Sequence, residues 1–215
     1  MKSTIMMTGS TTLIVSFTWL VVAVAATAQY GNNPVLDTAG EPLRRGVEYY
    51  IKPAITDNGG RFTLVDGSEW CQQYAGQEND SSGEGFPVTF EPLAEGEDAI
   101  RESRDLKITF AVITICIRST TWELEAQRDA ETGRRLIGTG SSGEATNYFQ
   151  IEKQSGFDGI YTIRWCPTEF CPICRFDCGS VGPVVKNGKR FLALDGFVIP
   201  VVFERAPLSP SSTNI

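Results

Sequence analysis

The cysteine-rich stretch WCPTEFCPICRFDCG, residues 165–179, is the part of the sequence with the clearest capacity for chemistry. As thiolates, Cys166, Cys171 and Cys174 match the C-x4-C-x2-C start of a plant-type iron–sulfur motif, and Cys178 follows closely as a fourth ligand. Four thiolates would also suit zinc. Once oxidised, the same side chains form disulfides and bind no metal. The compartment in which the chain folds therefore decides between these chemistries.

The N-terminus predicts that this compartment is the secretory pathway. Lys2 precedes the apolar run Leu13 to Ala26, and Ala26-Thr27-Ala28 supplies small residues for cleavage. The run is shorter than the roughly 20 residues that cross a membrane comfortably. We therefore predict a signal peptide over residues 1–28, one domain over 29–206 and a flexible tail over 207–215. We expect the protein to enter the secretory pathway.

In an oxidising lumen, six cysteines indicate a disulfide framework. The plant-type cluster places its fourth ligand far along the chain, whereas Cys178 follows after three residues. Zinc would need a site of cysteines alone, because the chain has no histidine, and a single C-x2-C at Cys171 and Cys174 is a weak signal for it. We predict no metal and no cofactor. The distribution favours Cys71 with Cys116, and leaves the other four to pair among themselves.

Composition argues for one domain that is not an enzyme. The apolar fraction of 41% suits a sizeable core, and the net charge of −7 argues against nucleic acid or an anionic membrane as partner. Without histidine, neither Ser-His-Asp nor Cys-His activation of a nucleophile is available. The acidic groups Glu78 and Asp80, or Glu95, Glu97 and Asp98, are interpreted as solvated loop charges.

Short alternating segments separated by Gly, Asn, Asp and Ser clusters predict an all-β fold. In the longest of them, Leu106, Ile108, Phe110 and Val112 share one face. The run Gly138 to Gly143 matches G-x-G-x-x-G, but a strand-like segment follows it, so we interpret it as a hairpin loop. The predicted strands are Tyr49–Lys52, Arg61–Val65, Leu106–Ile117, Trp122–Leu124, Asn147–Glu152, Tyr161–Trp165, Phe191–Leu194 and Ile199–Phe203.

Evenly spaced short strands suggest a closed barrel or a sandwich, and a weak internal repeat favours a repeated design. The unit aromatic-x-Ile occurs at Tyr49-Tyr50-Ile51, Phe149-Gln150-Ile151 and Tyr161-Thr162-Ile163.

The stretch VLDTAGEPLRRGVEYYI, Val35 to Ile51, closely resembles the N-terminal signature of the plant Kunitz-type (soybean trypsin inhibitor) family, including its miraculin-like branch. Ala39 departs from the acidic or polar residue usual at its position. The resemblance continues through GFPVTF (85–90), DLKITF (105–110), TWEL (121–124), YFQIEK (148–153) and YTIRWCP (161–167). It covers nearly the whole chain after the signal peptide.

This resemblance implies a β-trefoil, with twelve strands in three repeats of four. It also implies the disulfides Cys71–Cys116, Cys166–Cys178 and Cys171–Cys174, the last two nested. The cysteine cluster is then a braced hairpin without chemistry of its own.

The resemblance further implies inhibition of an endopeptidase, most simply of the serine class, by a substrate-like loop whose rigidity lowers the ordering cost of binding. Cysteine endopeptidases, bound through another loop, are the alternative class. The bond facing the protease would be Thr89–Phe90. The residues matching the inhibitory loop are Phe86, Pro87, Val88, Thr89, Phe90, Glu91 and Pro92.

Three departures from the trypsin-inhibiting members predict weak action on trypsin. Thr89 stands where a basic specificity residue is expected, Arg45 replaces the asparagine that braces the loop, and no Lys or Arg lies between Arg61 and Arg101. These departures leave open a non-inhibitory defence, storage or taste-modifying-type binding protein. Carbohydrate binding is a third hypothesis, which rests on fold-level analogy alone.

Two further expectations concern the surface. Asn79-Asp80-Ser81 is an N-x-S/T sequon, so we predict a glycan at Asn79. The six cysteines pair without remainder, so no interchain disulfide is expected and we predict a monomer.

Overall fold

The computed structural model describes residues 33–116 and 118–207. The chain divides into two units, Met1–Asn33 and Pro34–Ile215, and the fold below is that of the second. The predicted signal peptide, residues 1–28, lies outside the described residues, as does the predicted tail apart from Pro207. Within the described residues, no helix has the length and apolar character required to span a membrane.

Twelve short strands and one turn of 3-10 helix, η1 (Ala145–Asn147), make up the regular structure of the described residues. The all-β prediction is confirmed. The strands are β1 (Tyr49–Pro53), β2 (Phe62–Asp66), β3 (Gln73–Gln77), β4 (Val88–Pro92), β5 (Leu106–Phe110), β6 (Trp122–Arg128), β7 (Arg135–Thr139), β8 (Gln150–Lys153), β9 (Tyr161–Trp165), β10 (Gly179–Lys186), β11 (Lys189–Leu194) and β12 (Val201–Arg205).

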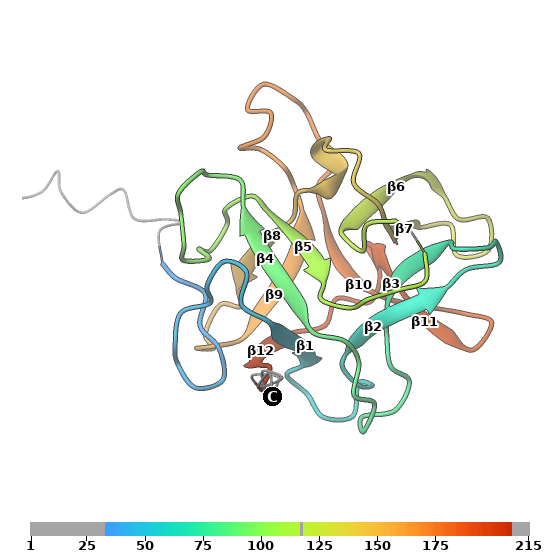
Figure 1. The fold of residues 1–215 in the computed structure, drawn as a ribbon, viewed down its shortest axis with the longest axis horizontal. Coiled ribbons are helices and arrows are strands. Elements are labelled where there is room, and N and C mark those ends of the chain that lie inside the picture. Colours follow the sequence, from blue (N-terminus) through green and yellow to red (C-terminus); the bar gives the residue numbers. More distant parts are fainter. Residues whose placement is uncertain (1–32, 117, 208–215) are drawn as a thin grey trace, which may run out of the picture. The chain divides into compact units, whose positions relative to one another are not determined.

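Six of these strands close into a ring. β1 pairs with β12 and β4, β4 pairs with β5, and β9 pairs with β8 and β12. The bridge between Leu106 and Phe149 joins β5 to the segment that leads into β8 and completes the circle. Figure 1 shows these six strands together on the left. A closed ring leaves no free sheet edge in the barrel.

The other six strands form three hairpins, β2–β3, β6–β7 and β10–β11, on the right in Figure 1. The hairpins pair with one another in all three combinations, through Tyr74 and Gly138, Leu136 and Ala193, and Phe191 and Gly76. Each repeat of four strands therefore contributes two barrel strands and one hairpin. The fold is the predicted β-trefoil.

The repeated aromatic-x-Ile unit supplies the inner face of the barrel. All six aromatic and isoleucine side chains of the three units are at most 2% exposed. Trp122, at the start of β6, is fully buried and contacts the rings of Phe62, Phe110 and Phe149. Because Phe62 comes from the first repeat and the other two from the second, these ring contacts hold different repeats together.

The expected strand Leu106–Ile117 is too long, because β5 ends at Phe110. Strands β3, β4, β7 and β10 have no counterpart among the predicted strands, and β4 lies in the segment predicted as the inhibitory loop. The sequences of the other three, QYAGQ, RLIGT and GSVGPVVK, contain Gly and polar residues that lower β-propensity. Tertiary pairing within the three hairpins overrides that local preference.

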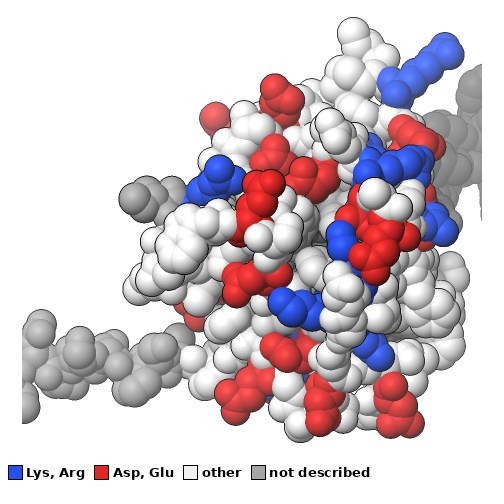
Figure 2. Space-filling view, turned by 90° about the vertical axis from the view of Figure 1, so that its right-hand side faces the viewer, with Lys and Arg blue, Asp and Glu red and all other residues white. Residues whose placement is uncertain are grey.

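Charged side chains of both signs are interspersed on the side of this unit that carries the hairpins. Figure 2 shows Asp and Glu next to Lys and Arg over most of that face, with uncharged areas between them. No large basic field is visible there, so this face has no feature typical of a surface that binds a polyanion.

Candidate functional site

The segment predicted as the inhibitory loop, Phe86–Pro92, is not an exposed loop. Val88–Pro92 is strand β4, paired with β5 along its whole length and with β1 at Val88. Val88 and Phe90 are 0% and 1% exposed. The backbone groups that a protease would have to contact are used in the barrel, so the expectation that this segment is an exposed loop is wrong, and a reactive bond between Thr89 and Phe90 stays a prediction. This segment forms a barrel strand because its apolar residues stand at alternate positions and so fit the inner face of the barrel.

An exposed loop begins directly after this strand, at residues 93–99. Its tip turns at Gly96, which has a φ of +75°, a value that glycine adopts readily, and Glu97 N–H donates to the carbonyl of Ala94. Glu95 and Gly96 are exposed, whereas Leu93 and Ala94 are half-buried. The loop carries three carboxylates, at Glu95, Glu97 and Asp98, and no basic residue.

Both legs of this loop are tied to one short segment, residues 44–46. On the outgoing leg, Gly46 N–H donates to the carbonyl of Phe90 at 3.1 Å, and the Arg45 guanidinium binds the Glu91 carboxylate at 2.7 Å. On the returning leg, Arg45 N–H donates to the carbonyl of Asp98 at 2.7 Å. Arg45 therefore connects the two legs, although it replaces the asparagine that the resemblance assigns to bracing.

The base of the loop is anchored in the core. Ile100 is fully buried, its N–H donates to the carbonyl of Leu43, and its carbonyl accepts from Val35 N–H, both at 2.9 Å. Arg44 adds an ion pair with Asp98 at 2.5 Å. The segment that carries the family resemblance, Val35 to Ile51, thus positions loop 93–99 through backbone hydrogen bonds and two ion pairs at its legs and base.

The cysteines pair as the resemblance implies. Disulfides join Cys71 to Cys116, Cys166 to Cys178 and Cys171 to Cys174, and the described residues include no free cysteine. No group of three or more Cys, Asp or Glu within the described ranges is placed to hold a metal ion. The cysteine cluster at 166–178 is therefore a structural hairpin in this fold.

Asp105 holds the base of that hairpin. Its buried carboxylate accepts hydrogen bonds from the N–H groups of Glu169 and Phe170 and from the Gln150 amide. Burial raises the pKa of Asp105 above its usual value, against the opposing effect of these donors. Glu169 returns the contact by accepting from Asp105 N–H. These reciprocal bonds fix the hairpin on the barrel.

The sequon residue Asn79 is exposed, and its side-chain nitrogen donates to the carbonyl of Gly188 at 2.8 Å. This nitrogen is the atom that would carry a glycan. Attachment of a sugar would need this contact to rearrange, and glycosylation of Asn79 stays a prediction.

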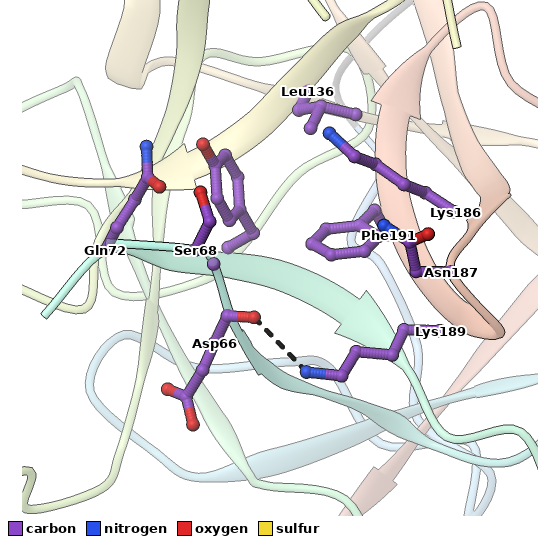
Figure 3. Close-up of a pocket in the computed structure, with 10 residues that line it drawn as sticks. Asp66, Ser68, Gln72, Leu136, Lys186, Asn187, Lys189 and Phe191 are labelled. Carbon is purple, nitrogen blue, oxygen red and sulfur yellow. Dashed lines mark hydrogen bonds between the residues drawn. The ribbon is translucent and has the colours of Figure 1, made fainter. Parts of the chain in front are cut away.

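A pocket of about 190 Å³ lies between the hairpins, against the edge-to-face pair of Tyr74 and Phe191 (Figure 3). Its two ammonium groups already have partners, because Lys189 donates to the carbonyl of Asp66 and Lys186 pairs with Asp129. The Lys186 ammonium lowers the pKa of Asp129 to about 2. The pocket is small compared with typical ligand sites, so we assign no site there.

Comparison with known proteins identifies the family. The family model described as trypsin and protease inhibitor, of the legume Kunitz type, matches residues 35–205. The chain belongs to the Kunitz family of plant protease inhibitors. A Kunitz type trypsin inhibitor of Medicago truncatula is 45% identical to this Kunitz chain over 201 residues, which cover 91% of this chain and 96% of the relative.

Two solved structures share the fold at similar levels. A Kunitz-type cysteine protease inhibitor from potato aligns with a TM-score of 0.70 and 30% identity, and the alignment covers 83% of this chain and 100% of the potato chain. A bifunctional alpha-amylase/subtilisin inhibitor from Oryza sativa aligns with a TM-score of 0.67 and 31% identity, covering 81% and 99%. The Kunitz family reading of the sequence is confirmed.

Proposed function

We propose that this chain inhibits a serine endopeptidase by presenting residues 93–98 to its active-site cleft. The observation that carries the proposal is the double attachment of this loop to residues 44–46, with one leg held at Phe90 and Glu91 and the other at Asp98. A loop whose legs are fixed before binding loses little conformational entropy in the complex. Such preorganisation is the property that an inhibitory loop requires.

The loop is suited to a target other than trypsin. Trypsin holds an aspartate in its specificity pocket, and the tip here offers the half-buried Ala94 and the exposed Glu95 and Gly96. A carboxylate that faces this buried aspartate is repelled, and a small uncharged side chain leaves the aspartate without a counter-charge. Enzymes with a shallow, uncharged pocket fit these residues better. The rice relative named a subtilisin inhibitor is consistent with a target of that kind.

The first test is a panel of trypsin, chymotrypsin, subtilisin and papain against the oxidised protein, with Ala94→Arg and Glu95→Arg as variants. We expect wild type to inhibit subtilisin and to act weakly on trypsin, and one of the two variants to gain at least a hundredfold in trypsin inhibition. Thr89→Arg is the matched control, because it adds the same side chain on strand β4, where the backbone is paired. Equal trypsin inhibition by all three variants and wild type would contradict the proposal.

A second candidate target is a cysteine endopeptidase, bound through the hairpin at 166–178. In Figure 1 the segment between β9 and β10, in orange, projects from the top of the barrel. Ile173 is 93% exposed within the turn closed by Cys171–Cys174. The potato relative is named a cysteine protease inhibitor. Papain inhibition that is abolished by Ile173→Asp but unchanged in Glu95→Arg would favour this candidate.

We also propose that the inhibitor acts as a monomer in the apoplast or the vacuole. Three disulfides with no free cysteine among the described residues support an oxidising compartment. The proposed activity is steric blocking of an endopeptidase, without catalysis by this chain. Secretion of the full chain from plant cells, with the N-terminus of the mature form determined by mass spectrometry, tests the compartment and the predicted cleavage after Ala28 together.

A further inference from the structure

The chain leaves the barrel after β5 at Phe110 and returns at Thr120, and these two residues are hydrogen-bonded to each other. Phe110 N–H donates to the carbonyl of Thr120 at 3.2 Å, and the Thr120 hydroxyl donates to the carbonyl of Phe110 at 2.7 Å. One residue further in, the hydroxyls of Thr109 and Thr121 hydrogen-bond at 2.8 Å. The excursion between β5 and β6 therefore has a closed neck.

The outer part of the excursion is held at a second point. Cys116 is joined to Cys71, which lies in the turn between β2 and β3. Just before it, the Thr114 hydroxyl donates to the carbonyl of Cys116 at 3.0 Å. Residues 113–116 are thus suspended between the hydroxyl-bonded neck and a disulfide to another hairpin.

Ala111 and Val112 still make backbone hydrogen bonds, to the carbonyls of Pro87 and Phe110, but the three residues that follow make none through their N–H groups. Within the described residues, no protein group accepts from the N–H groups of Ile113, Thr114 or Ile115. The side chains alternate as in a strand, with Ile113 and Ile115 exposed and Thr114 and Cys116 half-buried. An alternating segment with free backbone donors and acceptors has the form that binds by strand addition.

The outward side chains are large and apolar. Ile113 is 100% exposed and Ile115 is 86% exposed, and across the disulfide Trp70 is also 86% exposed. A groove of about 430 Å³ separates the turn that holds Trp70 from residues 114–116, and its charged lining residues, Asp66 and Glu69, are both acidic. Several large apolar groups gathered at one place on a surface indicate a binding function.

We infer that residues 113–116 form a second protease-contact segment, which binds the substrate cleft of an endopeptidase whose specificity pocket accepts a branched aliphatic side chain. Endopeptidase clefts pair with the backbone of an extended peptide and take alternate side chains into pockets, and this segment offers both features. Its anchors at Phe110 and Cys116 supply the rigidity.

This inference rests on the proposed function only in treating the chain as an inhibitor, because the two segments are separate in the fold. Loop 93–99 precedes β5, whereas residues 113–116 follow it. They also differ in chemistry, since the first tip is small and acidic and the second is aliphatic. Substitutions in one segment therefore leave the contacts of the other intact.

The first experiment introduces a trypsin-specific residue into the segment. Ile113→Arg and Ile115→Arg are measured separately in the full, oxidised chain for inhibition of trypsin. We expect one of them to inhibit trypsin at least a hundredfold more strongly than wild type. Val185→Arg is the matched control, because Val185 is also exposed, at 68%, but its backbone is paired with Arg190 in β10–β11. No gain in either isoleucine variant, or cleavage without inhibition, overturns the inference.

The second experiment uses the native residues and pancreatic elastase, which accepts aliphatic side chains. Wild type is expected to inhibit elastase, Ile113→Asp or Ile115→Asp to weaken this inhibition at least tenfold, and Val185→Asp, at an exposed position of the β10–β11 hairpin, to leave it unchanged. Glu95→Arg is measured beside them. Loss in Glu95→Arg alone would overturn the inference and uphold the proposed function of loop 93–98. Loss in the isoleucine variants alone upholds the inference even if loop 93–98 fails its own test. Absence of elastase inhibition in wild type overturns it.

The third measurement separates a protease from a second copy of the chain. Sedimentation of wild type and Ile115→Asp between 1 and 100 μM should give the mass of a monomer for both. A wild-type dimer that Ile115→Asp dissociates would show that another copy covers the segment, and would overturn the inference.

Discussion

Strand β4 and the segment after β5 carry the same alternation of apolar and other residues but face opposite environments. In β4, Val88 and Phe90 are at most 1% exposed, whereas Ile113 and Ile115 are at least 86% exposed. β4 lies between β1 and β5, while residues 113–116 have no strand beside them among the described residues. Alternation shows which side chains share a face, and neighbouring strands decide whether that face is covered.

Truncation of a buried side chain in β4 should have the largest effect on the free energy of unfolding. Phe90→Ala removes a core ring that contacts Tyr49 and Phe203, so we expect a loss of about 3–5 kcal/mol in the free energy of unfolding. Ile115→Ala, which removes an exposed side chain, should change it by about 0.5 kcal/mol or less. Urea unfolding followed by tryptophan fluorescence measures both. Similar losses in the two variants would mean that Ile115 is packed in solution.

Removal of the disulfide at the outer end of the exposed segment should have the next largest effect. Cys71→Ser with Cys116→Ser opens a link between residues 45 positions apart, and we expect a loss of about 3 kcal/mol, within the usual 2–4. If the link also holds residues 113–116 for binding, the elastase inhibition attributed to Ile113 and Ile115 should fall while inhibition through loop 93–98 persists. Equal losses at both segments would remove the distinction between them.

The hydroxyl cluster at the neck should contribute less. Thr109→Val deletes the hydrogen bond to the Thr121 hydroxyl, and the expected cost is about 1 kcal/mol. Amide hydrogen exchange of Phe110 should accelerate, because its N–H donates to Thr120 across the same neck. Unchanged exchange at Phe110 would show that the neck is closed by the backbone alone.

The smallest effect on stability is expected at the brace of loop 93–98. Arg45→Ala removes the half-exposed ion pair with Glu91 but keeps the backbone bond to Asp98, so we expect about 0.5 kcal/mol or less. Inhibition of subtilisin should weaken several-fold, because one leg of the loop loses its link to the other. Arg44→Ala, which leaves that link intact, is the control, and an equal loss there would argue against bracing by Arg45.

Much of the fold could be predicted because the repeated units of its core are short patterns of neighbouring residues. The units at Tyr49, Phe149 and Tyr161 indicated inward faces of separate strands, and all are buried. Strands β3 and β7 could not be predicted in the same way, since they pair with distant hairpins and contain residues that weaken isolated strands. Strand β10 pairs with its neighbours β9 and β11, but its glycines and proline also weaken an isolated strand. The loop that we propose, 93–98, begins directly after the segment predicted from the sequence, because the pattern around Val88 and Phe90 fits a stiff exposed loop as well as a buried strand.

The sequence by itself determined the β class, the family and the even set of cysteines, since composition, short-range alternation and motif spacing are local properties. Only the tertiary structure decided which alternating segment lies in the barrel and which is exposed. It also showed that Arg45 links both legs of loop 93–99 and that Cys116 holds residues 113–116 against another hairpin. These outcomes depend on contacts between residues that are distant in the sequence, and the local sequence does not determine which neighbouring strand covers a face.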